Sequence, residues 1–93
     1  MITIHIPTPL RAYTEKNASV LVSANTVQEA LDALLAQYPA LGKHLIDPQG
    51  KLRSFINIYL GDEDIRFLEQ TATELAEGDE LSIIPSIAGG AYA

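Results

Sequence analysis

Residues 26–38 carry the strongest local signal in this chain, and that signal is for a helix. Thr26 and Glu29 form a capping box, in which each side chain accepts a hydrogen bond from a backbone amide at the helix start. The apolar residues that follow share one helical face: Val27, Ala30, Leu31, Leu34, Leu35 and Tyr38. Pro39 disfavours helical geometry at Tyr38 and ends the helix. A single amphipathic helix must bury its apolar stripe against another element.

Short segments of alternating polarity predict that this element is a β-sheet. Ile2, Ile4 and Ile6 alternate with polar residues, and Val20 with Val22 marks a second strand. Further strands are predicted over residues 52–60, 65–67 and 80–84, with turns at 47–50, 61–64 and 78–79. Residues 41–46 indicate a short second helical turn, and residues 68–76 are ambiguous, with one helical turn as the only element suggested. The predicted class is α+β, with one main helix on a mixed sheet of four to five strands.

Charge and cysteine content exclude several function classes. Twelve acidic and six basic residues give a formal charge of −6, which repels phosphate backbones and anionic lipid. We therefore expect neither nucleic acid nor membrane as a partner, but a protein with a basic rim. The absence of cysteine excludes a disulfide framework, a thiolate metal site and a cysteine nucleophile. No export signal or membrane-length apolar run is recognised, so we expect a cytoplasmic protein.

The titratable residues do not form a catalytic pattern. His5 and His44 each lack a second ligand at metal spacing, and we expect ordinary structural or surface histidines. Residues 62–64, an Asp-Glu-Asp run, lack the full oxygen cage of a calcium loop and read as a solvated turn. No nucleophile-base motif is present. We therefore expect no metal, no cofactor bound by the chain itself and no independent enzymatic activity.

A partner surface is predicted on the sheet face opposite the helix. Phe55, Tyr59 and Ile84 are apolar and fall on that face, and Ile87, just beyond the last strand, is assigned to the same surface. Exposed apolar patches on small domains often mark contact sites. The alternative is that a loop covers these side chains.

The C-terminal segment holds the second informative feature, the pair Gly89-Gly90 followed by Ala91-Tyr92-Ala93. Consecutive glycines pass through channels too narrow for side chains, as an enzyme acting on a terminal carboxylate requires. The carboxyl group of Gly90 is joined to Ala91, so this use requires removal of residues 91–93. We predict a domain over residues 1–87 and a flexible tail over 88–93. An ordinary frayed terminus is the alternative.

Together these segments resemble the ubiquitin-like β-grasp sulfur carriers of the ThiS/MoaD type. The resemblance rests on the strand order and on the ending from Gly78 to Gly90, and it includes residues 6–11, 55–59 and 62–67. It is closest to the carriers of thiocarboxylate-dependent amino-acid biosynthesis. The implied fold is a β-grasp.

The resemblance also implies partners and a mechanism. An adenylating enzyme would use ATP to activate the Gly90 carboxylate, and a sulfur donor would displace AMP to leave a thiocarboxylate. A zinc metalloprotease of the JAMM type would first cleave between Gly90 and Ala91. A pyridoxal-phosphate-dependent sulfhydrylase or another acceptor enzyme would then take the sulfide, in synthesis of cysteine, methionine or a related metabolite.

Three functions remain open on the sequence. The first is a sulfur carrier for a sulfur amino acid or a similar metabolite. The second is a ubiquitin-like modifier joined to lysines through Gly90. The third is a β-grasp interaction module with an inert tail.

Overall fold

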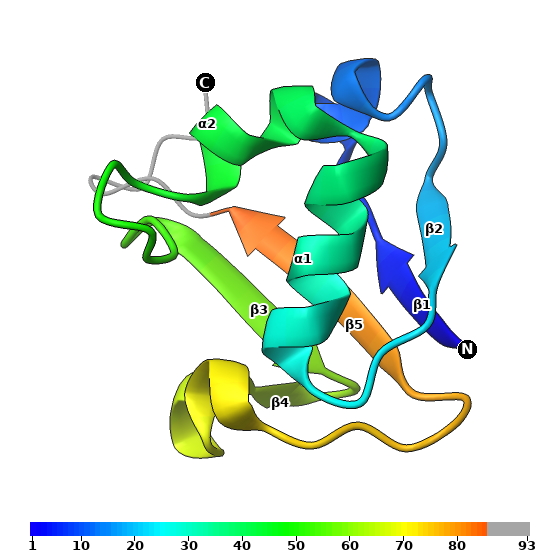
Figure 1. Cartoon of the computed structure of the whole chain (residues 1–93), viewed down its shortest axis with the longest axis vertical. Helices are drawn as coiled ribbons and strands as arrows, with labels where there is room; N and C mark the ends of the chain where they lie inside the picture. Colours follow the sequence, from blue (N-terminus) through cyan, green and yellow to red (C-terminus); the bar gives the residue numbers. More distant parts are fainter. Residues whose placement is uncertain (86–93) are drawn as a thin grey trace.

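The computed structural model describes residues 1–85, which form a five-stranded sheet with helices packed on one face (Figure 1). The sheet order is β2-β1-β5-β3-β4. The strands are β1 (Ile2–His5), β2 (Ser19–Val22), β3 (Ile56–Leu60), β4 (Glu63–Asp64) and β5 (Glu80–Pro85). β1 runs parallel to β5, and every other neighbouring pair is antiparallel. The predicted mixed sheet is therefore confirmed.

The main helix, α1 (Val27–Gln37), crosses one face of this sheet (Figure 1). The Thr26 hydroxyl accepts a hydrogen bond from the Glu29 amide at 3.2 Å, as the capping box predicts. The Glu29 carboxylate accepts from the Asn25 amide at 2.9 Å, one residue earlier than the usual capping-box partner. Tyr38 ends the helix. The predicted helix over 26–38 is confirmed.

Short helical turns fill most of the remaining connections. They are η1 (Thr8–Tyr13), η2 (Pro39–Leu41), α2 (Gly42–Leu45), η3 (Ile65–Phe67) and η4 (Gln70–Ala72). η2 and α2 confirm the predicted second helical segment. Within residues 1–85, no helix combines the length and apolar character needed to cross a membrane.

The core lies between α1 and the covered face of the sheet. Both the α1 stripe and the inward residues of the strands are buried: Ile2, Ile4, Ile6, Val20, Val22, Val27, Ala30, Leu31, Leu34, Ile56, Ile58, Leu81 and Ile83. Alternation along β5 follows the prediction, because Leu81 and Ile83 are buried while Ile84 is exposed. All of these core positions precede residue 85.

Two strand predictions differ from the structure. The predicted strand at 65–67 is wrong, since these residues form η3. The Asp64 carboxylate caps this turn by accepting from the Arg66 amide at 2.9 Å, which favours a tight helical turn over extension. The strand predicted over 52–60 begins only at Ile56, and Leu52 instead forms an isolated bridge with Ile46.

The strand register places Pro85, the last described residue, at one end of the sheet. Pro85, the last residue of β5, pairs with Ile56, the first residue of β3. β1 runs parallel to β5 and ends on its other side. The segment beyond Pro85 therefore starts at the end of the sheet where β3 begins and β1 finishes.

Candidate functional site

The predicted partner surface is partly assembled on the uncovered sheet face. Ile84 pairs with Asn57 across β5 and β3, and Tyr59 lies two residues further along the same face of β3. Side chains at such diagonal positions are about 7–8 Å apart and within reach of an aromatic ring. Ile84 is 45% exposed, and Tyr59 is partly buried. The structure therefore places Tyr59 and Ile84 together on the face opposite α1.

Phe55 lies at the margin of this surface rather than within a strand. It sits in the turn that leads into β3, next to Ile56 and thus level with Pro85, and is 42% exposed. Among residues 1–85, no loop buries Phe55 or Ile84. Phe55 and Ile84 therefore lie beside Pro85, whereas Tyr59 lies further along the face, level with Ser82. Ile87 lies outside the described residues, and its assignment stays a prediction.

A polar network beside this surface was missed by the sequence analysis. Asp64, expected in a solvated turn, is only 6% exposed, and its carboxylate lies 2.8 Å from the Arg66 guanidinium. Arg66 also donates to the side-chain oxygen of Asn57. The hydrogen bond from Arg66 lowers the pKa of Asp64 below its ordinary value, so the pair remains ionised near neutral pH. An Asp followed two residues later by Arg, just after a turn, was the signal available for this network.

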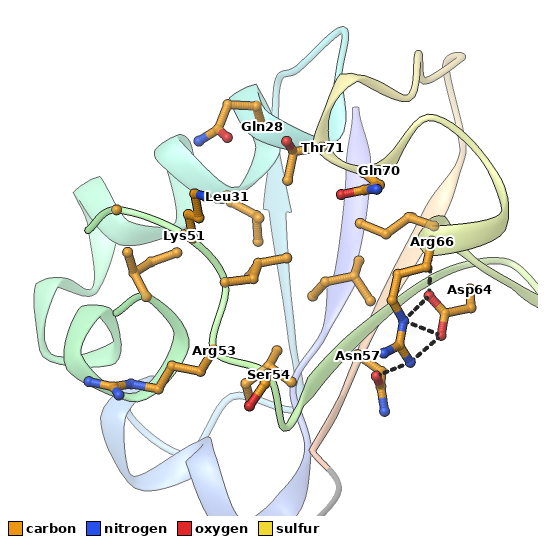
Figure 2. Close-up of a pocket in the computed structure, with 16 residues that line it drawn as sticks. Gln28, Leu31, Lys51, Arg53, Ser54, Asn57, Asp64, Arg66, Gln70 and Thr71 are labelled. Carbon is orange, nitrogen blue, oxygen red and sulfur yellow. Dashed lines mark hydrogen bonds and ion pairs between the residues drawn. The ribbon is translucent and has the colours of Figure 1, made fainter. Parts of the chain in front are cut away.

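A cavity of about 500 Å³ opens at the edge of the sheet next to this network (Figure 2). β4 pairs only with Tyr59 and Leu60, so among residues 1–85 no strand covers the edge of β3 from Ile56 to Ile58. Figure 2 shows one wall formed by Asn57, Asp64 and Arg66 and another by Lys51, Arg53 and Ser54. No histidine lines the cavity, and residues 1–85 hold no cluster of three metal-ligating side chains. The side chains that line the cavity are suited to binding, and they include no nucleophile paired with a general base.

The two histidines occupy different environments. His5 is exposed on β1, with Nε2 2.6 Å from Glu80 Oε1. His44 packs its ring against Tyr13, with ring centroids 4.3 Å apart, and its buried Nε2 has no hydrogen-bond partner within the described residues 1–85. The expectation of ordinary structural or surface histidines is confirmed: His44 is a structural residue packed against η1, and His5 lies at the surface.

The predicted working residues at the C-terminus, Gly89, Gly90 and Ala91, lie outside the described residues. Their roles, and the predicted domain boundary between residues 87 and 88, stay predictions.

Comparison with known proteins decides the family. The model of the ThiS family matches residues 4–90, nearly the whole chain. The chain belongs to the ThiS family. This match ends at Gly90, so residues 91–93 lie beyond it.

Among curated relatives, the sulfur carrier protein CysO of Mycobacterium tuberculosis is 43% identical over 91 residues, covering 96% of this chain and 98% of that protein. Small archaeal modifier protein 1 of Haloferax volcanii is 38% identical over 65 residues, covering 70% of each. Among solved structures, a chain in the BexX/CysO complex of Amycolatopsis orientalis matches this structure with a TM-score of 0.87 and is 38% identical in sequence. The match covers 97% of this chain and all of that one.

These similarities confirm the β-grasp, ubiquitin-like fold predicted from the sequence. The relatives are carrier and modifier proteins rather than enzymes, which confirms the expectation that this chain is not an independent enzyme. The relative from Amycolatopsis orientalis was crystallised in a complex with a second protein, BexX.

Proposed function

We propose that this chain is a sulfur carrier that works through a thiocarboxylate on Gly90. The observation that carries the proposal is the 43% identity to a sulfur carrier over nearly the full length of both proteins. The family match that ends at Gly90 supports this residue as the working end.

The chemistry follows from the properties of a carboxylate. In an adenylating enzyme, a carboxylate oxygen of Gly90 attacks the α-phosphorus of ATP and releases pyrophosphate. The acyl-adenylate then has a good leaving group, and sulfide from a donor replaces AMP at the carbonyl carbon. The resulting thiocarboxylate carries the sulfur without a cysteine, in agreement with the composition of the chain. An acceptor enzyme, such as a pyridoxal-phosphate-dependent sulfhydrylase, takes the sulfide for a sulfur amino acid or related metabolite.

Residues 91–93 act as a lock on this chemistry. The bond to Ala91 leaves Gly90 with a neutral, resonance-stabilised amide in place of a carboxylate. Hydrolysis of the Gly90–Ala91 bond, by a zinc metalloprotease of the JAMM type, supplies the free carboxylate. Gly89 and Gly90 lack side chains and let the segment enter both the protease and the adenylating enzyme.

The uncovered face of the sheet, opposite α1, is the outer face, and it is the proposed docking surface for the adenylating enzyme. Tyr59 and Ile84 lie on it and Phe55 borders it; Phe55 and Ile84 are close to the end of β5, while Tyr59 lies further back, level with Ser82. A partner that covers these side chains is therefore positioned to receive the segment that follows Pro85.

A ubiquitin-like modifier is the second candidate. Similarity to small archaeal modifier protein 1 favours it. The activation of Gly90 would be the same, but a lysine amine would replace sulfide as the nucleophile.

A pyrophosphate-exchange assay tests the proposal with the host's adenylating enzyme and two purified lengths, residues 1–90 and 1–93. The core lies before residue 85, so both lengths keep it. We expect exchange with the shorter chain and none with the longer one. Gly90→Ala in the shorter chain is expected to lose most of the activity, because a Cβ crowds the path to the nucleotide. Equal exchange by both lengths, without proteolysis, would contradict the lock. No exchange by either length would contradict activation of Gly90.

A further inference from the structure

The charged residues of this protein are separated between the two ends of the sheet. Every charged side chain lies within residues 1–85, since residues 86–93 contain none. Five of the six basic residues belong to segments at the end where β5 finishes: Arg11, Lys16, Lys43, Lys51 and Arg53. Only two acidic residues, Glu15 and Asp47, lie in the same segments, which gives this basic end a formal charge of +3.

Hydrogen bonds connect Arg53, Lys43 and Arg11 to the strand ends beside Pro85. On one side, Ile56, which pairs with Pro85, donates its amide to the Arg53 carbonyl at 2.9 Å. Arg53 Nε in turn donates to the Lys43 carbonyl at 2.9 Å. On the other side, beyond the end of β1, Arg11 Nε donates to the Ile6 carbonyl at 3.0 Å. Figure 1 shows η1, α2 and the end of β5 at the same end of the molecule.

One of the two acidic residues at the basic end is already engaged. The Asp47 carboxylate accepts from the backbone amides of Gln49 and Lys51, at 2.9 and 3.0 Å. Lys16, Lys43 and Lys51 are exposed, while Arg11 and Arg53 are partly buried. The basic end thus presents three exposed lysines.

The opposite end is strongly acidic. Nine acidic residues lie there, in the first turn of α1, the β3–β4 turn and the segments that lead into β5: Glu29, Asp62, Glu63, Asp64, Glu69, Glu74, Glu77, Asp79 and Glu80. Arg66 is the only basic residue among them and is paired with Asp64. The terminal amino group lies against Glu77. Asp32, midway along α1, belongs to neither end.

This separation gives the two ends opposite local fields despite the net charge of −6. The two ends are separated by the six residues of β5, about 20 Å, and charges interact over a Debye length of about 8 Å at physiological ionic strength. A surface that approaches Pro85 therefore meets the nearby lysines, while the acidic end is screened. The overall charge favours a partner with a basic rim, but the basic end around Pro85 favours a partner surface that is acidic.

We propose that the basic end docks against an acidic protein surface around the channel of the adenylating enzyme that takes the segment beyond Pro85. The proposal rests on the function proposed above and adds an orientation to it. An acidic surface at the channel attracts the basic end and repels the acidic end, so the carrier arrives with its C-terminal segment leading. Charge complementarity of this kind acts mainly on the rate of association.

Lys43→Glu is the test variant. Its side chain is exposed, and the hydrogen bond from Arg53 uses only its backbone carbonyl. A second variant combines Lys43→Glu with Glu74→Lys at the acidic end, which restores the net charge of −6 while weakening the separation of charge. Glu74→Lys alone is the matched control. All three are made in the chain of residues 1–90.

Association with the host's adenylating enzyme is followed by stopped-flow fluorescence at low and at physiological ionic strength. The carrier contains no tryptophan, so any tryptophan signal comes from the enzyme. We expect both variants that carry Lys43→Glu to associate about 3- to 10-fold more slowly at low salt, with a smaller effect at higher salt. Glu74→Lys alone should not slow association.

Pyrophosphate exchange at saturating carrier separates this proposal from the proposed function. We expect all variants to reach the parent rate there, because docking rate does not limit a saturated enzyme. If the charge-balanced double variant associates as fast as the parent, the basic end has no role in docking and only this proposal is overturned. If the parent chain of 1–90 gives no exchange, the proposed function fails, and the docking proposal fails with it.

Discussion

Replacing Ile84 by Asp should separate folding from docking. Ile84 is 45% exposed on the outer face, so about half of its side chain already contacts water. Burying a whole isoleucine contributes about 1.5–3 kcal/mol, and the loss here is therefore about 1 kcal/mol. A strand position adds up to about 1 kcal/mol more for the poorer β-propensity of Asp. A domain with about 5–15 kcal/mol of stability remains folded.

The same substitution should be far more costly in the complex. A partner that covers the outer face would bury the new carboxylate without an opposite charge, at a cost of about 3–5 kcal/mol. Since about 1.4 kcal/mol corresponds to a tenfold change, we expect the dissociation constant for the adenylating enzyme to rise by at least about 100-fold. Isothermal titration calorimetry measures this change, and thermal unfolding checks that the variant is folded.

Leu21→Asp is the matched control. Leu21 is 58% exposed on β2, pairs with Thr3 of β1 and is separated from β5 by that strand. It therefore introduces the same charge on the same face of the sheet, away from Tyr59 and Ile84. We expect it to bind nearly as the parent does. Unchanged affinity of Ile84→Asp, or equal losses for both variants, would remove the Tyr59 and Ile84 surface from the docking site.

Three further predictions concern stability. Asp64→Asn should lower the unfolding free energy by about 1–2 kcal/mol at neutral pH. Because Arg66 depresses the folded-state pKa of Asp64, the difference should shrink as the pH falls below the ordinary pKa of an aspartate and be lost once the pH falls through the lowered folded-state pKa, as pH-dependent urea denaturation would show. Thr26→Ala should lose about 1 kcal/mol, or about 4–8 °C in Tm, whereas Thr26→Ser should keep the cap. Gly78→Ala should lose about 1 kcal/mol through its φ of +88°, whereas Gly42→Ala, without positive φ, should not lower Tm.

The sequence predicted the elements whose stability is local or periodic. The α1 cap requires only Thr26 and Glu29, three residues apart, and alternation along β1 and β5 directly reports the buried face. Both features are present in the structure, because the residues that the helical and alternating patterns mark as apolar are the ones that the helix and the sheet bury.

The gaps in the prediction concern residues whose environment depends on side-chain contacts that the periodic patterns do not report. Asp64 looks like part of a solvated turn until Arg66 folds back on it and Asn57 joins from β3. Sequence spacing does not show whether His44 is a structural or a surface residue, because that depends on α2 packing against η1 and bringing Tyr13 to its ring. The charge separation was also hidden, because the five basic residues come from three segments that only the parallel β1–β5 pairing and the β3–β5 register bring to one end.

The central claim, that Gly90 carries sulfur, is tested most directly by intact-protein mass spectrometry of this protein purified from its host. The account predicts a chain that ends at Gly90, with one oxygen of its terminal carboxylate replaced by sulfur. A fragment spectrum should place that replacement on Gly90. Conjugates of Gly90 with lysine, without any thiocarboxylate, would support the modifier function instead. A chain that retains Ala93 throughout and carries no sulfur would contradict the account.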